Sequence, residues 1–257
     1  MKVVILAGGL GTRLREETEY RPKPMVLIGG RPILWHIMKI YASYGHTDFV
    51  VCLGYRGDVI RDYFLNYEIH NCDFTITLGS RELDIHNGHS EHGWRLTLAE
   101  TGEKTMTGGR IKRVAKYLRE GPFMASYGDG VADIAIDRLL ELHRRRGKLA
   151  TLTAVRPLSR FGELSIDGER VRAFHEKPQI TEGWINGGFF VFEPEALDLI
   201  AGDEEGLEAG LLSRLAVENQ LAVYQHDGFW QCMDTYRELK LLDDLWSANQ
   251  APWKTWR

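Results

Sequence analysis

Strand-like and helix-like segments alternate through the first 155 residues, and this alternation constrains the fold more than any other feature. Short apolar runs, typical of buried strands, occur at residues 3–6, 49–53, 123–127 and 149–155. Segments with apolar residues at helical spacing lie at 32–45, 59–67, 111–118 and 136–143. This order predicts a mostly parallel sheet with helices on both faces. In such sheets ligands bind beyond the carboxyl ends of the strands.

The chain has 257 residues, which is enough for one large α/β domain. Residues 73–100 interrupt the alternation with short β-like runs around a Gly/Asn/His-rich loop. Residues 236–257 form an amphipathic helix and a tail whose Trp253 and Trp256 we interpret as packing or interface anchors. We therefore predict a single domain over residues 1–257, with a small β insertion at 73–100.

Composition excludes several classes of protein. The net charge of −4 provides no global basic field for nucleic acid. No apolar run approaches the roughly 20 residues that span a bilayer, and the N-terminus enters a strand without a signal-peptide pattern. The three cysteines show no C-x-x-C spacing, which indicates reduced thiols. We expect a cytoplasmic protein that binds neither nucleic acid nor membranes.

The first strand runs into a glycine-rich loop, AGGLGTR at residues 7–13. The loop is not a P-loop, because no glycine is followed by Lys-Ser or Lys-Thr. It is not a dinucleotide fingerprint either, because Leu14 stands where the third glycine belongs. Two interpretations remain open. The backbone approaches an anionic ligand, with Arg13 and Lys23 supplying positive charge, or the loop is a tight turn that needs positive φ.

Two aspartates stand where a metal ligand could be presented. Asp129 lies between Gly128 and Gly130 at the end of a predicted strand, which suits Mg²⁺ held by one or two carboxylates and substrate phosphates. The alternative is a common Asp-Gly turn. Asp234 precedes the last helix, where an N-cap is the competing interpretation.

Residues 162–192 read as a hairpin followed by a strand. Lys177 could meet a phosphate and Glu176 could accept sugar hydroxyls, although a solvated surface turn remains possible for both. Asn186, followed by two glycines, marks either a close backbone approach or a bulge.

Three histidines, His86, His89 and His92, lie in the sequence HNGHSEH. Their i, i+3, i+6 spacing does not match a zinc pattern, so we do not expect a metal site there. The sequence also shows no Ser/His/Asp or Cys/His arrangement for nucleophilic catalysis.

Residues 6–14 and the segment Pro22-Lys23-Pro24-Met25 resemble the signature of the sugar-1-phosphate nucleotidylyltransferases. The segments at Asp129, 176–178 and 186–188 follow in that family's order, and the resemblance covers the whole chain. It implies a Rossmann-like, mostly parallel mixed sheet flanked by helices, of the nucleotide-diphospho-sugar transferase type. Cys232 departs from the proline expected at its position, while Asp234 remains matched.

Within the family, the resemblance is strongest to members that convert CTP and α-D-glucose 1-phosphate into CDP-glucose and pyrophosphate. It implies Mg²⁺ as cofactor, a homo-oligomer, and a product that feeds deoxysugar and O-antigen synthesis in bacteria. Three alternatives remain. In the first, the enzyme uses UTP or dTTP instead of CTP. In the second, the chain is a metal-dependent glycosyltransferase, although Gly-Asp-Gly does not supply the Asp-x-Asp motif that such an enzyme needs. In the third, it is a non-catalytic sugar-nucleotide-binding protein.

The resemblance also implies a role for each matched residue. The catalytic residues would be Arg13, Lys23 and Asp129, and the metal ligands Asp129 and Asp234. The nucleotide would contact Leu6, Ala7, Gly8, Gly9, Gly11, Thr12, Arg13, Lys23, Thr107, Arg110 and Gly128. The sugar phosphate would contact Gly162, Glu176, Lys177 and Asn186.

Overall fold

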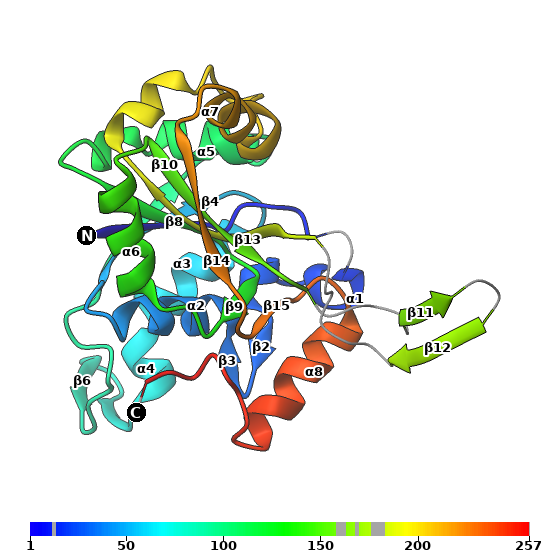
Figure 1. The fold of residues 1–257 in the computed structure, drawn as a ribbon. Coiled ribbons are helices and arrows are strands. Elements are labelled where there is room, and N and C mark those ends of the chain that lie inside the picture. The colour runs from blue at the N-terminus through cyan, green and yellow to red at the C-terminus, as the bar shows by residue number, and fades with distance from the viewer. Residues whose placement is uncertain (12–13, 158–162, 168–169, 176–182, 257) are drawn as a thin grey trace.

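The computed structural model describes residues 1–11, 14–157, 163–167, 170–175 and 183–256 (Figure 1). A seven-stranded sheet lies at its centre, in the order β14-β10-β13-β8-β1-β4-β7. Strand β13 pairs antiparallel with both of its neighbours, and the other neighbouring strands pair in parallel. The predicted mixed, mostly parallel sheet is confirmed. Its strands are β1 (Lys2–Leu6), β4 (Asp48–Leu53), β7 (Arg95–Glu100), β8 (Phe123–Tyr127), β10 (Ala150–Val155), β13 (Ile185–Phe192) and β14 (Leu221–His226).

Shorter elements complete the described chain. Two-stranded ladders are formed by β2 (Leu27–Ile28) with β3 (Arg31–Pro32), β5 (Phe74–Thr77) with β6 (Glu82–Ile85), β9 (Gly130–Ala132) with β15 (Trp230–Cys232), and β11 (Glu163–Asp167) with β12 (Arg170–His175). The α-helices are α1 (Arg15–Thr18), α2 (Ile33–Ala42), α3 (Gly57–Leu65), α4 (Tyr67–Asn71), α5 (Thr107–Arg113), α6 (Ile136–Arg146), α7 (Ser213–Val217) and α8 (Tyr236–Ser247). The 3₁₀ turns are η2 (Lys23–Met25), η3 (Ala115–Tyr117) and η4 (Pro194–Leu199), and η5 (Leu207–Leu212) is a π-helix.

Alternate residues of each central strand pack into different cores, because successive side chains of a strand point to opposite faces. In β1, Val3 and Ile5 belong to the core that α2 and α6 cover. Val4 and Leu6 belong to the core covered by α5, η4, η5 and α7. Burial on both faces explains why the strands read as continuous apolar runs in the sequence.

The carboxyl ends of β1, β4 and β8 lie level with one another. Leu6 pairs with both Cys52 and Tyr127 in the sheet register. Strand β13 runs the other way, and its Phe189 pairs with Ser126. Its first residues therefore reach the same edge of the sheet, so this edge collects the glycine loop, the residues after Tyr127 and the start of β13.

The predicted segment at 73–100 divides into two parts. Strands β5 and β6 form a separate hairpin, as Figure 1 shows at the lower left. Strand β7, however, pairs in parallel with β4 and forms the edge of the main sheet. The predicted insertion was therefore too long, because a strand of alternating polarity at a half-exposed sheet edge resembles a surface hairpin in the sequence.

Two predicted helices end earlier than expected. The segment at 59–67 is divided at Asn66 between α3 and α4. The segment at 111–118 is helical only to Arg113 and continues as the 3₁₀ turn η3. Its apolar stripe survives this change, because Val114 and Leu118 are both buried in the same core. The helical spacing of the apolar residues was predicted correctly, but this spacing does not determine where an α-helix changes into a 3₁₀ turn.

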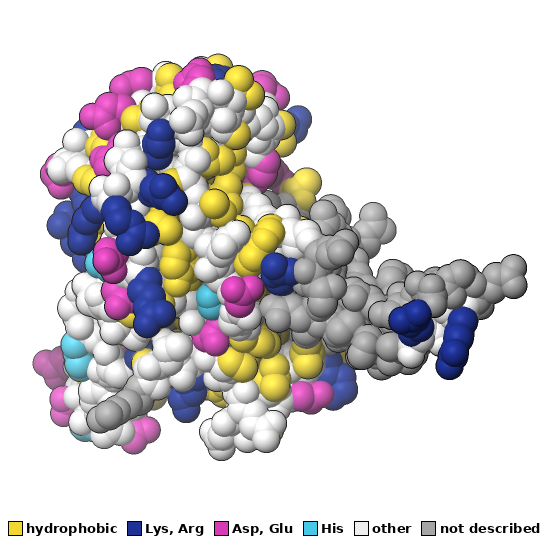
Figure 2. Space-filling view, viewed as in Figure 1, with side chains coloured by type: hydrophobic (Ala, Val, Ile, Leu, Met, Phe, Trp, Pro, Cys, Tyr) yellow, Lys and Arg dark blue, Asp and Glu magenta, His cyan; other side chains and the backbone are white. Residues whose placement is uncertain are grey.

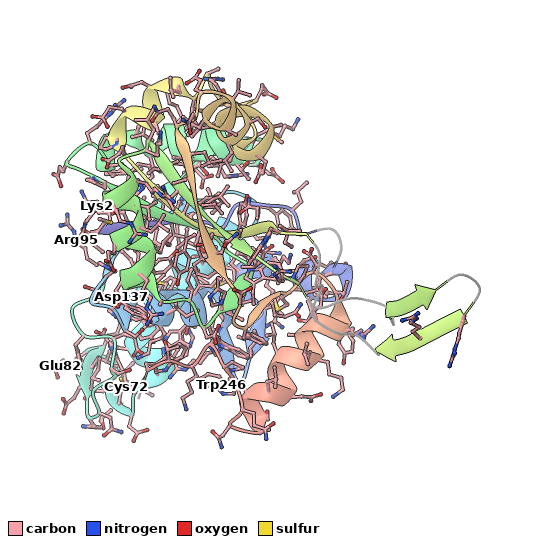
Figure 3. All side chains as sticks on the ribbon, viewed as in Figure 1. Lys2, Cys72, Glu82, Arg95, Asp137 and Trp246 are labelled. Atoms are coloured by element: carbon pink, nitrogen blue, oxygen red, sulfur yellow. The ribbon has the colours of Figure 1, made fainter. Side chains whose placement is uncertain are left out.

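The C-terminal tail packs against its own chain. Trp253 is fully buried and stacks on Phe229, and Trp256 lies edge-on to Trp35. Trp246, labelled in Figure 3, contacts the His36 ring from α8. The expectation that these tryptophans act as packing anchors is confirmed.

Charged side chains on the face shown in Figure 2 gather over α6, whose last turn carries the exposed Arg144, Arg145 and Arg146. Cations are favourable at a helix C-terminus, which accounts for this cluster.

Among the helices of the described residues, none combines the length and apolarity needed to cross a membrane.

Candidate functional site

The three glycines of the first loop differ in what the protein itself requires of them. Gly11 has φ +63°, so the tight-turn interpretation holds at that position. A Cβ on Gly8 would lie 2.1 Å from Nη1 of Arg110, so Gly8 makes room for that side chain. A Cβ on Gly9 would meet no atom of the described residues within 4 Å, and Gly9 is exposed. Internal packing therefore does not explain Gly9, whose backbone is open to a ligand.

The side chain of Arg110 holds the backbone of this glycine loop. Its guanidinium is buried and donates to the carbonyl oxygen of Gly8 at 2.9 Å and to that of Leu53 at 3.1 Å. It also donates to Thr101 Oγ1 and to the carbonyl of Gly102. Arg110 thus connects the loops that follow β1, β4 and β7, and it acts on the glycine loop through the backbone.

The backbone brings the two predicted metal ligands together. Strand β15 pairs with β9, with Cys232 opposite Gly130, and the amide of Met233 donates to the Asp129 carbonyl at 2.8 Å. Asp234 follows directly and so lies beside Asp129. Both carboxylates accept from the Lys23 ammonium, whose nitrogen lies 2.7 Å from Asp129 Oδ2. Three residues that the sequence analysis selected separately therefore form one cluster.

The position of Lys23 follows from the local sequence. Pro22 and Pro24 flank it in a buried 3₁₀ turn, where Lys23 itself is only 9% exposed. Burial lowers the pKa of Lys23, but the charges and hydrogen bonds of Asp129 and Asp234 outweigh this effect and raise it above 10.5. The ammonium therefore stays charged at neutral pH and partly neutralises two carboxylates.

The N-cap interpretation of Asp234 is wrong, because Thr235 caps α8. The Thr235 hydroxyl accepts from the Glu238 amide, and the Glu238 carboxylate accepts from the amides of Thr235 and Asp234. This capping box satisfies the helix end and leaves the Asp234 carboxylate directed at Lys23. Cys232 stays an inert thiol beside the cluster, because burial raises its pKa to about 12.

Asn186 lies at the same sheet edge, as the second residue of β13. Its side-chain oxygen accepts from the Gly188 amide at 2.9 Å, and its nitrogen donates to the Tyr127 hydroxyl at 3.1 Å. The Trp230 indole donates to the Gly187 carbonyl at 2.8 Å. The backbone is also irregular here, as the bulge interpretation expected, because the register of β13 with β10 shifts between Asn186 and Phe190. The side-chain contacts hold the Asn186 amide in one orientation.

Two further predicted residues serve the protein's own packing. A Cβ on Gly128 would lie 2.7 Å from the Leu6 carbonyl, so glycine permits the close approach of two strand ends. The Thr107 hydroxyl donates to Glu208 at 3.1 Å and accepts from the Leu207 amide, so it joins α5 to η5. The backbone of Ala7, also predicted, donates its amide hydrogen to the Cys52 carbonyl.

Five other predicted residues lie outside the described residues: Thr12, Arg13, Gly162, Glu176 and Lys177.

The sequence analysis assigned no role to Tyr127, Glu208 or Trp230, although all three hold neighbours of the site. Tyr127 directly precedes Gly128 and Asp129, and that position at a strand end was the available signal. Glu208 lies in η5, 81 residues from its partner Tyr127, and no local pattern indicates it. Among the described residues, no group of three or more His, Cys, Asp or Glu side chains could hold a metal.

Comparison with known proteins decides the family. The family model described as nucleotidyl transferase matches residues 2–250. The chain belongs to the nucleotidyl transferase family. Within it, the chain is 51% identical to the glucose-1-phosphate cytidylyltransferase of Salmonella typhi over 257 residues, which is 100% of both chains. It is 42% identical to the "Probable glucose-1-phosphate cytidylyltransferase" of Bacillus subtilis over 258 residues, again 100% of both.

Solved structures agree with this nucleotidyl transferase fold. The crystal structure of HddC from Yersinia pseudotuberculosis superposes with a TM-score of 0.69, at 22% identity, covering 95% of this chain and 99% of that one. A nucleotidyl transferase takes a nucleoside triphosphate, and a divalent metal normally assists this chemistry. Lys23, Asp129 and Asp234 place one ammonium and two carboxylates together at the carboxyl edge of the sheet.

Proposed function

We propose that this chain is a glucose-1-phosphate cytidylyltransferase, which makes CDP-glucose and pyrophosphate from CTP and α-D-glucose 1-phosphate. The observation that carries this proposal is the 51% identity, over the full length of both chains, to the Salmonella typhi enzyme of that name. The convergence of Lys23 with Asp129 and Asp234 supports it. A non-catalytic binding protein would not need two carboxylates and a lysine at one point.

The reaction joins two anions, so neutralisation and positioning carry most of the catalysis. A phosphate oxygen of glucose 1-phosphate attacks the α-phosphorus of CTP in line, and pyrophosphate leaves. The sugar phosphate is already anionic, so the step requires no general base. Lys23, together with Arg13, stabilises charge on the departing pyrophosphate.

Asp129 and Asp234 fit a divalent cation, because both already bind the cationic ammonium of Lys23. Two carboxylates completed by substrate phosphates form a usual magnesium site. We infer that these residues hold Mg²⁺, which neutralises the reacting phosphates when bound. The capping box of Thr235 and Glu238 means that the Asp234 side chain is not needed as the cap of α8.

The nucleotide lies over the glycine loop in this proposal. Its contacts are Thr12, Arg13, Lys23 and the backbone of Leu6, Ala7, Gly8, Gly9, Gly11 and Gly128. Arg110 acts through the Gly8 carbonyl that it holds, and Thr107 acts through η5. On the sugar side, Lys177 binds the phosphate, while Glu176, Asn186 and the Gly162 backbone bind glucose hydroxyls.

We also propose that the chain is one domain over residues 1–257 and that it forms a homo-oligomer. The sheet takes strands from both ends of the chain, and the buried Trp253 packs in the same core as Val3. These contacts support a single domain.

The β5–β6 hairpin supports assembly into a homo-oligomer, because its cross-strand pairs form one apolar face whose residues are each more than a third exposed. That face consists of Phe74, Ile76, Leu83 and Ile85. Light scattering should report a multimer, and Ile76→Lys should lower its mass.

Pyrophosphate release separates this function from its alternatives. The enzyme should release pyrophosphate from CTP only when a sugar 1-phosphate is present. A metal-dependent glycosyltransferase or a non-catalytic sugar-nucleotide-binding protein would release none. Asp129→Asn serves as the matched control, since it removes one charge and keeps the side chain's size.

A further inference from the structure

Tyr127 and Glu208 form a hydrogen-bonded unit beside the proposed sugar site. Tyr127 is the last residue of β8, and its hydroxyl bonds to one carboxylate oxygen of Glu208 in η5. The other Glu208 oxygen accepts from the Thr107 hydroxyl at 3.1 Å. The Asn186 nitrogen reaches the Tyr127 hydroxyl at 3.1 Å. A chain of hydrogen bonds thus runs from Thr107 through Glu208 and Tyr127 to Asn186.

The direction of each hydrogen bond in this chain is fixed by donor and acceptor chemistry. An ionised carboxylate only accepts, and a phenol has one proton. Tyr127 therefore donates to Glu208, and its oxygen is left to accept from Asn186. Burial and the Glu208 carboxylate raise the pKa of Tyr127 above 10, so this proton remains in place at neutral pH.

The orientation of the Asn186 amide follows from this direction. Its nitrogen faces Tyr127, and its oxygen accepts from the Gly188 amide at 2.9 Å. One N–H of the amide then remains to bind a ligand. Two further contacts hold the segment, since Trp230 donates to the Gly187 carbonyl and the Tyr127 ring lies against Gly188.

We infer that Tyr127 and Glu208 are positioning residues for the sugar phosphate, which act by fixing Asn186 so that its free amide N–H meets a sugar hydroxyl. This inference rests on the proposed function, because it assigns a glucose hydroxyl to Asn186. Neither residue contacts the reacting phosphorus. Losing the Tyr127 hydroxyl therefore weakens recognition of the sugar and leaves recognition of the nucleotide intact.

Binding of CDP-glucose and of CDP, measured by calorimetry, separates these two effects. Tyr127→Phe should weaken CDP-glucose binding about 3- to 10-fold, the value of one hydrogen bond, and should change CDP binding by less than about twofold. Kinetically, the KM for glucose 1-phosphate should rise while the KM for CTP stays constant. Tyr44→Phe, the same change at a half-buried tyrosine after α2, is the matched control and should match the wild type.

Variants of Glu208 and Asn186 test the mechanism. Glu208 is exposed, so its variants should fold. Glu208→Ala should weaken CDP-glucose binding as Tyr127→Phe does, and Glu208→Gln should recover most of this binding because its carbonyl can still accept from Tyr127. Tyr127→Phe should add nothing to Asn186→Ala, since both act through one amide.

Three results would overturn the inference. They are unchanged CDP-glucose binding in Tyr127→Phe, equal weakening toward CDP and CDP-glucose, or additive losses in the double variant. If Tyr127→Phe does not fold, Glu208→Ala with wild-type binding overturns it equally. A wild-type protein that releases no pyrophosphate from CTP and glucose 1-phosphate would instead overturn the proposed function, and with it this role for Asn186.

Discussion

The Lys23 ammonium lies 2.7 Å from Oδ2 of Asp129 and also bonds to Asp234, so one lysine occupies the space between two proposed metal ligands. A divalent cation and Lys23 compete for the same carboxylates in this arrangement. If the two carboxylates held a metal, the ammonium would be released and could meet the triphosphate. In the proposed function, Lys23 would then be a counter-ion without substrate and a phosphate ligand with it.

Removing this lysine charge should strengthen metal binding in the absence of nucleotide. We expect Lys23→Gln to bind Mn²⁺ about tenfold more tightly than the wild type, because a competing positive charge is lost. Calorimetric titration with Mn²⁺ alone measures this. Lys2→Gln, at the opposite edge of the sheet beside Glu120, is the control. Unchanged or weaker binding in Lys23→Gln would show that the lysine does not compete with the metal.

Neighbouring substitutions at the start of α8 should separate catalysis from helix capping. Asp234→Asn should lower kcat by about 100-fold or more, since it replaces a charged ligand of a hard cation, with little change in Tm. Thr235→Ala should cost about 1 kcal/mol of stability, or about 2–4 °C in Tm, while kcat remains within a few fold. Near-normal turnover in Asp234→Asn would remove Asp234 from the metal site.

Adjacent glycines should respond differently to alanine. A Cβ on Gly8 would clash with the buried Arg110 guanidinium, so Gly8→Ala should lower Tm by several degrees. A Cβ on Gly9 would contact no atom within 4 Å in the part of the chain that the structure describes, so Gly9→Ala should keep the wild-type Tm and raise the KM for CTP. Thermal melts and initial rates measure both. A normal KM for CTP in Gly9→Ala would argue against nucleotide contact at that position.

Acid should loosen the packing of the tail through His36. Burial lowers the pKa of His36 to about 4, and the neutral ring bonds to the Ile28 carbonyl and the Trp253 indole. Because the folded pKa lies below the unfolded value near 6.5, this stabilisation is complete above pH 6.5 and is lost as pH falls toward 4. The free energy of unfolding should drop by about 2 kcal/mol from this group between pH 7.5 and 5.

Denaturant melts at the two pH values test this contribution. His36→Gln removes the titrating ring. Between pH 7.5 and 5, the free energy of unfolding of this variant should therefore fall about 2 kcal/mol less than that of the wild type. His70→Gln, at an exposed histidine in α4, is the control and should keep the pH dependence of the wild type. Equal pH dependence in His36→Gln and the wild type would exclude this role.

The central strands were predictable because each is buried on both faces and therefore apolar throughout. Strand β7 was read as β-like, but its place in the main sheet was not predicted, since register depends on partners distant in the sequence. The same limit applies to the site. The sequence indicated Lys23, Asp129 and Asp234 separately, and their contacts join residues 106 and 211 positions apart.

Glu208 illustrates the part of the site that local patterns do not reveal. It stands in an exposed π-helical segment and is chemically unremarkable until Tyr127 and Thr107 are placed beside it. Arg110 shows the opposite case. Its residue type suggested a nucleotide contact, but its burial directs the guanidinium to backbone carbonyls. Residue type identified the candidates, while burial and partners determined how each of them acts.

The most direct test of the central claim is a competition among nucleotides. Initial rates of pyrophosphate release should be measured with glucose 1-phosphate and each of CTP, UTP, dTTP, ATP and GTP, and the sugar nucleotide formed should be identified by mass spectrometry. We expect CTP to give the highest kcat/KM, with CDP-glucose as the product. A tenfold preference for UTP or dTTP, or the absence of any sugar nucleotide with CTP, would contradict the assignment.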